Sequence, residues 1–454
     1  MSWVKIMFCK ISNRKGSMSK INKIILNSVM SLALLTSVFY ACIRLFTIFT
    51  NTYTSGDEGG FLHVFNIFIE SGFYEANVYG NSTVFNGISY LFYLVGFDRL
   101  MSLRITNLFS AISSIYLLWF FVIRNFNHLS RLYRNAIMIT SVNAMIVVSF
   151  IFSGINDTFI TFFTILFFII LYKIKGNKGK KNLLYFFFIG GVFALILSTR
   201  KMGVLLFPTF IFVLILYFYN QKFGFKIIMN RVSVIAVSFL LGLLLFNYPS
   251  LKENGKLSFH EKKIETEGVS WSQLQYLTAI WLEEGKVEYG KHCKPEDVIA
   301  YISKNGNKSL PNSVLETMTF NIGRSFKTST REAIYLIKPY TRILGLVFVF
   351  GLFFFLIGVF KKEITLKKII NNEIAVFFIN YNIIIVLIIC SYVEPRWFLP
   401  IIVLMPIMFF SYFFNLKDKG KIGGKFEFLT LGVHFLLLGL MNVKFIMNNY
   451  QFIF

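Results

Sequence analysis

Long apolar segments constrain this chain more than any other feature. Runs of about twenty residues with few or no charges recur from residue 24 almost to the C-terminus. A helix of that length crosses the ~30 Å hydrocarbon core of a bilayer. Of the 454 residues, 56% are hydrophobic and only 15% are charged, which is far from a soluble composition. The sequence therefore predicts an all-α polytopic membrane protein.

The apolar runs predict about 11 transmembrane helices. The first begins after a basic N-terminus and lacks the short apolar core and cleavage site of a signal peptide, so we expect it to be retained. The predicted spans are residues 24–49, 103–123, 135–152, 158–172, 183–199, 204–219, 232–248, 343–360, 374–391, 397–414 and 428–443.

Basic residues predict the topology. Lysines and arginines cluster in alternate connecting segments, at 124–134, 173–181, 222–231, 361–368 and 417–425. Cytoplasmic loops carry this excess of basic residues, so the N-terminus is expected in the cytoplasm and the C-terminus outside. The net charge of +24 thus has a topological explanation, and because the charges form no single patch, nucleic-acid binding is not expected.

These loops divide the chain into four parts. Residues 1–23 form a basic cytoplasmic N-terminus, and residues 24–250 form a transmembrane catalytic module with a first external loop at 51–98. Within that loop, residues 61–69 and 84–95 are apolar but too short to span, and are expected to be interfacial helices. Residues 251–338 form a small external cap, with a helix start signal at Pro295, and residues 339–454 form the C-terminal transmembrane helices.

Ionisable residues next to the spans gather on the predicted outer face. The middles of the spans contain almost none, with His434 as the clear exception, so the charged route of a transporter is missing. Each outer charge, taken singly, could be an interfacial or capping residue. The outer set is Asp57, Glu58, Asp98, Arg99, Arg104, Asp157, Arg200, Lys201, Lys338, Arg342, Glu394 and Arg396.

The adjacent carboxylates Asp57 and Glu58 open the first external loop. No lysine or arginine lies between Arg44 and Arg99, so the pair has no such ion-pair partner nearby in sequence. One interpretation is a helix N-terminus, with Ser55 or Asp57 capping the next turn. The other is a functional site, since carboxylates at a membrane face commonly meet a ligand.

Further motifs follow the acidic pair in order along the chain. Residues 96–104 enter the second span and end at Arg104, and Asp157 opens the fourth span. Arg200 and Lys201 lie in the turn of residues 197–208, and Glu394 and Arg396 begin the motif of residues 394–400. This set resembles the GT-C superfamily of integral-membrane glycosyltransferases, in particular the protein O-mannosyltransferases and the lipid A aminoarabinose transferase. Two departures are the absence of prolines at residues 79–87 and of a soluble C-terminal domain.

The resemblance implies an enzyme that moves a hexosyl or pentosyl group from a polyprenyl-phosphate carrier to a lipid, glycan or protein acceptor. The reaction would take place at the external face of the plasma membrane, or of the inner membrane of a bacterium, as part of cell-envelope glycan synthesis.

The resemblance also implies residue roles. Asp57 would be the catalytic base, with Asp157 as a second carboxylate, and a single displacement would invert the anomeric carbon. Glu58 would orient the acceptor or, with Asp57, hold a divalent cation; no organic cofactor is expected. The donor phosphate would meet Arg200, Lys201 and Arg396. Arg104, Glu394 and His63 would be supporting residues, with Arg104 expected to pair with Asp57 or Asp157.

Two other functions remain open from the sequence. An O-antigen-type polysaccharide polymerase also has many spans and a large external loop, but we would expect that loop to be rich in arginine, and here it holds only Arg324 and Arg331. A lipid-linked oligosaccharide flippase or other transporter would carry charges inside the bundle or two similar halves, and neither pattern is visible.

Overall fold

The computed structural model describes residues 18–54, 57–148, 150–176, 182–200, 202–258, 268–288, 291–349, 351, 369, 372–388 and 394–450. Every regular element within these ranges is a helix. Six of the described helices are long and apolar enough to cross a membrane, as a multi-pass membrane protein requires. They are α2 (Lys20–Phe49), α5 (Arg99–Asn125), α7 (Asp157–Gly176), α10 (Phe225–Asn254), α18 (Leu399–Asp418) and α19 (Gly424–Tyr450).

The helices group into two compact units. The larger comprises Met1–His260, Tyr340–Phe378 and Phe398–Phe454, and the smaller comprises Glu261–Pro339 and Ile379–Trp397. The larger unit contains the shorter helices α6 (Arg131–Val147), α8 (Asn182–Thr199) and α9 (Met202–Asn220). Helix α17 (Glu373–Ile388) begins in the larger unit and ends in the smaller one.

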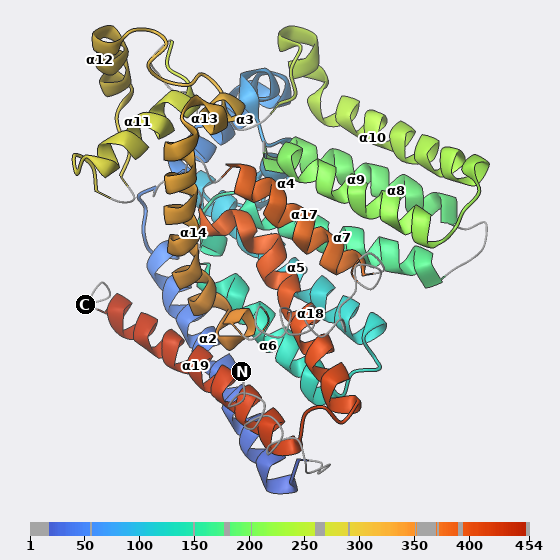
Figure 1. Ribbon diagram of the computed structural model, residues 1–454. Coiled ribbons are helices and arrows are strands. Elements are labelled where there is room, and N and C mark those ends of the chain that lie inside the picture. The colour runs from blue at the N-terminus through green and yellow to red at the C-terminus, as the bar shows by residue number, and fades with distance from the viewer. Residues whose placement is uncertain are drawn as a thin grey trace. The chain divides into compact units, whose positions relative to one another are not determined.

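The larger unit is built from neighbouring helix pairs around two central helices. Helices α7 and α18 are mostly buried, whereas α2 and α10 are mostly exposed, as expected for helices that face lipid. Helix α2 runs beside α19, and α8 runs beside α10 (Figure 1). Small residues allow α8 and α10 to approach closely. A Cβ at Gly190 would lie 2.3 Å from the Ile235 carbonyl oxygen, and one at Gly242 would lie 2.6 Å from the Ala194 Cβ.

A buried polar cluster ties α2, α6 and α19 together. The Asn442 side-chain amide donates to Ser37 Oγ and to Asn143 Oδ1, both at 2.9 Å. The Asn143 amide in turn donates to the Ile343 carbonyl at 3.0 Å. Such bonds between helices stabilise membrane bundles, where side chains have no water to bind.

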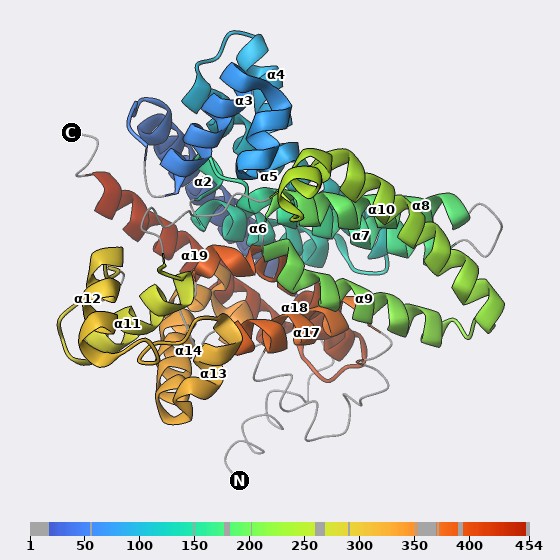
Figure 2. The ribbon, with the colours of Figure 1, turned by 90° about the horizontal axis from the view of Figure 1, so that it is seen from above.

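The first predicted external loop contains two helices, α3 (Glu58–Gly80) and α4 (Thr83–Leu94). They lie side by side next to the start of α5 (Figure 2). Both predicted short helices are present, but α3 is much longer than residues 61–69. It is interrupted at Gly72, where φ is 85°, a left-handed value that favours glycine.

One predicted span ends earlier than expected. The span at residues 135–152 corresponds to α6, which stops at Val147 and is followed by a short 3₁₀ helix, η1 (Phe150–Phe152). Side chains satisfy the backbone beyond this point, because Glu58 accepts from the Gly154 amide and Asn107 donates to the Ser153 carbonyl. Most of the span predicted at residues 343–360 lies outside the described residues.

The smaller unit has its own core. Helix α11 (Trp271–Glu283) begins with a capping box, in which Ser270 and Gln273 exchange side-chain and backbone hydrogen bonds. Helix α12 (Pro295–Asn305) starts at the predicted Pro295, and α13 (Val314–Phe320) follows. Helix α14 (Ile322–Leu344) begins in the smaller unit and ends in the larger one. The core residues are Leu274, Tyr276, Leu277, Ile280, Cys293, Val298 and Leu310.

Candidate active site

Asp57 stands at the N-terminal end of α3. Its carbonyl oxygen accepts hydrogen bonds from the Gly60 and Phe61 amides, at 3.1 and 3.3 Å. Its side chain is half-buried and makes no capping hydrogen bond to the helix. Asp57 is thus the N-cap residue of α3 by position, as the interpretation as a helix N-terminus expects, but its side chain does not cap the next turn. Ser55 lies outside the described residues.

Glu58, the next residue, is fully buried and forms an ion pair with Arg104 of α5. Glu58 Oε1 lies 2.8 Å from Arg104 Nε, and Glu58 Oε2 lies 2.9 Å from Arg104 Nη2. This is the parallel two-bond geometry in which guanidinium and carboxylate pair most strongly. Arg104 was expected to pair with Asp57 or Asp157; its ion pair is instead with Glu58, because the first turn of α3 points this residue inward.

The remaining donors of Arg104 hold the chain between α2 and α3. Arg104 Nη1 donates to the Ile48 and Asn51 carbonyls at 2.5 Å each, and Nη2 donates to the Tyr53 carbonyl at 3.1 Å. All five N–H groups of the guanidinium are thus used. Since carbonyls at the end of a helix lack partners within it, this arrangement also caps the C-terminus of α2. Arg104 is a positioning residue for the segment that carries Asp57.

The segment before α7 completes this arrangement. The Gly154 amide donates to Glu58 Oε1 at 2.6 Å. The Asn156 side chain donates to Ser82 Oγ at 3.0 Å and to the Thr199 carbonyl at 2.6 Å. These contacts join the start of α4, the start of α7 and the end of α8 at one end of the larger unit.

Asp157 and Arg200 are brought together by this folding. Arg200 Nη1 donates to Asp157 Oδ1, and both side chains are largely buried. The two residues are 43 positions apart in the sequence, and the α7–α8 hairpin returns the chain to the same end of the bundle. Lys201 lies outside the described residues.

The other predicted residues are placed differently. Arg396 and Glu394 form an ion pair with each other in the smaller unit, at the 3₁₀ helix η2 (Pro395–Phe398). His63 lies on an exposed face of α3, with its ring edge-on to that of Tyr79 at 5.4 Å between centroids.

Glu58 does not suit the role of metal ligand. Its oxygens already accept three hydrogen bonds, two of them from a cationic guanidinium, which would repel a divalent ion. Within the described ranges no three His, Cys, Asp or Glu side chains converge in a metal-binding arrangement.

Sequence reasoning missed Gly154, Asn156 and Asn107. The signal was present in the cluster of small and polar residues at 153–158, which interrupts an apolar stretch. Asn107, one turn after Arg104, accepts from the Thr158 hydroxyl and donates to the Ser153 carbonyl. Such residues inside apolar surroundings indicate backbone that leaves the helix and needs side-chain partners.

Comparisons with known proteins add no identification. No protein-family profile matches the sequence, and no curated protein matches it significantly.

Proposed function

We propose that the protein is a glycosyltransferase that moves a sugar from a polyprenyl-phosphate carrier to an acceptor hydroxyl at the external membrane face. The fold that this proposal assumes is GT-C-like, with about eleven spans, a cytoplasmic N-terminus and a small external cap. The helical architecture and the six long apolar helices support the coarser part of that description.

One observation carries the proposal. Two carboxylate and guanidinium pairs, Glu58 with Arg104 and Asp157 with Arg200, lie at the same end of the larger unit. The first pair is fully hydrogen-bonded and fixes the backbone next to Asp57. The second pair is less enclosed, since 14% of the Arg200 side chain is exposed. A carboxylate on a fixed backbone, here Asp57, and a partly accessible guanidinium, here Arg200, are the groups that transfer from a phosphate-linked sugar requires.

The proposed mechanism is a single displacement. Asp57 accepts the proton of the acceptor hydroxyl while the oxygen of that hydroxyl forms a bond to the anomeric carbon. The bond from that carbon to the phosphate oxygen breaks, and the phosphate leaves with the electron pair. Arg200 binds the departing phosphate, while Asp157 holds the guanidinium in position. Because the hydroxyl attacks from the face opposite to the departing phosphate, the configuration at the anomeric carbon is inverted.

The test is a transfer assay in membranes with polyprenyl-phosphate sugars. Asp57→Asn keeps the size of the side chain and removes its basicity, so we expect at least a hundredfold loss of transfer with unchanged expression and thermal stability. The matched control is Asp98→Asn, because Asp98 caps α5 through the Met101 amide and has no role in the proposed mechanism.

The results of this assay distinguish Asp57 as the base from the alternatives. Loss in Asp57→Asn with activity retained in Asp98→Asn supports the base assignment. Transfer that survives in Asp57→Asn contradicts it and leaves Asp157 as the candidate base. If the wild-type protein moves no sugar from any such donor, the assignment as a polyprenyl-phosphate-dependent glycosyltransferase is wrong. A polysaccharide polymerase or a flippase then becomes the candidate function.

A further inference from the structure

A cavity of about 630 Å³ opens at the other end of the larger unit. It lies between the first turns of α2, the N-terminus of α6 and the C-terminus of α18. From Asn27, which lines it, to Ile48, which contacts Arg104, α2 rises through 21 residues, or roughly 32 Å. The cavity is therefore separate from the candidate active site. Its lining residues are Lys23, Asn27, Met30, Ser31, Ser130, Arg131, Leu132, Asn135, Ile139 and Lys417.

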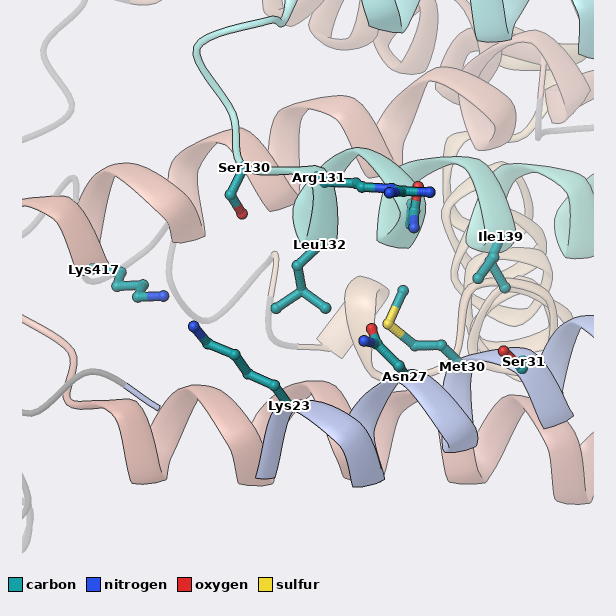
Figure 3. A pocket seen from close by; sticks show the side chains of 10 residues that line it. Lys23, Asn27, Met30, Ser31, Ser130, Arg131, Leu132, Ile139 and Lys417 are labelled. Atoms are coloured by element: carbon teal, nitrogen blue, oxygen red, sulfur yellow. The ribbon is translucent and has the colours of Figure 1, made fainter. Parts of the chain in front are cut away.

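Among the residues that the structure describes, the lining carries three cations and no carboxylate. Figure 3 shows the amino groups of Lys23 and Lys417 pointing into the same space from opposite walls, with the Ser130 hydroxyl above them. Like charges that face one another are unfavourable unless an anion lies between them. Glu427, outside the lining, holds the Lys417 amino group in place at 2.6 Å, so the cavity retains positive charge from Lys23 and Arg131.

The backbone adds to this positive potential. Ser130 is the N-cap residue of α6, and its side chain makes no capping hydrogen bond. The first turn of the helix, at Arg131 and Leu132, lines the cavity. The N-terminus of a helix carries partial positive charge and amides without helical partners, both of which suit an anion.

An apolar hollow adjoins the cavity along α2. It shares Asn27 and Ser31 with the cavity and continues past Ile24, Leu32 and Leu35. These three side chains are 58%, 55% and 66% exposed, so they form an uncovered apolar strip. A basic pocket that continues into an apolar strip has the two-part chemistry of a phospholipid, with an anionic headgroup and acyl chains.

We propose that this cavity binds the phosphate headgroup of an anionic membrane lipid, with an acyl chain along the exposed face of α2. The occupant is a bilayer phospholipid and not a free anion, because the apolar strip adjoins the basic pocket directly. The topology predicted from the basic loops puts this end of the bundle at the cytoplasmic leaflet, whose lipids are the negatively charged ones. The lipid would link α2, α6 and α18.

The test uses the purified full-length protein in detergent. Thermal unfolding is followed while phosphatidylglycerol, phosphatidylcholine or inorganic phosphate is added. We expect phosphatidylglycerol to raise the unfolding temperature in a saturable manner, and the other two to have much smaller effects. Lys23→Gln and Arg131→Gln should each raise the half-maximal lipid concentration about fivefold. Lys226→Gln, which removes an exposed lysine from the first turn of α10, is the matched control and should change nothing.

Several outcomes would overturn the proposal. Equal stabilisation by phosphatidylcholine would show that the headgroup charge is not recognised. Equal stabilisation by inorganic phosphate would show a site for a free anion. Identical lipid titrations for Lys23→Gln and Lys226→Gln would place lipid binding elsewhere. Since Lys23 is exposed, its substitution should leave folding intact, and the comparison does not depend on the Arg131 variant.

Discussion

Glu58 and Arg104 meet in a two-bond ion pair whose side chains are 0% and 3% exposed. Removal of one partner leaves an uncompensated buried charge, which costs about 3–5 kcal/mol. Arg104→Gln should therefore lower the unfolding temperature strongly, and Glu58→Gln should lower it by a similar amount. Fluorescence-detected size-exclusion chromatography after heating measures both.

The exposed pair of Arg99 and Glu70 provides the control. These side chains are 36% and 60% exposed, and exposed ion pairs contribute little to stability. Arg99→Gln should leave the unfolding temperature unchanged. A loss as large as that of Arg104→Gln would mean that burial is not what makes the Glu58 pair important.

Gly154 is the tightest point of the same arrangement. A Cβ there would lie 2.8 Å from the Leu103 Cβ and 3.2 Å from Glu58 Oε1. Gly154→Ala should thus destabilise the protein by about 1–3 kcal/mol through overpacking. The same substitution at Gly87, inside α4, meets no atom within 4 Å and should be neutral or stabilising. Equal unfolding temperatures for the two variants would contradict this tight packing around Gly154.

Asn442 tests the polar cluster between α2, α6 and α19. Asn442→Ala removes its hydrogen bonds to Ser37 and Asn143, and should cost about 1 kcal/mol of stability. Asn127→Ala changes an exposed residue in the connection between α5 and α6 and should cost nothing. If both variants unfold at the same temperature as the wild-type protein, these buried hydrogen bonds make no net contribution to stability.

Arg200 tests how the proposed donor is bound. A guanidinium that binds phosphate through charge-assisted bonds contributes about 1.5–3 kcal/mol, so Arg200→Gln should lower kcat/KM for the donor by about 10- to 100-fold. Arg200→Lys should recover part of this loss, since the charge remains while the planar geometry is lost. If Arg200 only positions Asp157, the donor KM would stay constant in both variants. Steady-state kinetics with varied donor concentration separates the two roles.

Cys293 gives the smaller unit a pH dependence. Burial raises the pKa of this thiol above its ordinary value of 9.0. Because the folded state keeps its proton to higher pH, the stability from this group is complete below about pH 9 and is lost as the pH rises through the folded pKa. A variant with Cys293 as its only cysteine should resist alkylation at pH 7.5 and unfold more easily above pH 9. The Cys293→Ala variant should show a weaker decline over the same interval.

The membrane class and most helix positions could be read from the sequence, because long apolar runs have few alternatives in a bilayer. Asp157 and Arg200 could be chosen as candidate site residues, since charges beside apolar spans are conspicuous. Their pairing could not be predicted, because it depends on how α7 and α8 return to one end of the bundle. The Glu58 partner was missed for a related reason: Arg104 is 46 residues away, and sequence distance says nothing about which face of α3 turns inward.

The partners of Glu58 also impose an order on folding. Arg104 lies 46 residues after Glu58, and Gly154 lies 96 residues after Glu58. At synthesis rates of roughly 5–20 residues per second, the carboxylate waits several seconds before either partner has been made. During that interval it must remain hydrated, because an unpaired charge is expensive to bury. The first loop thus cannot reach its final packing until α5 and the start of α7 have been synthesised, and chains truncated before Gly154 would lack one hydrogen-bond partner of Glu58.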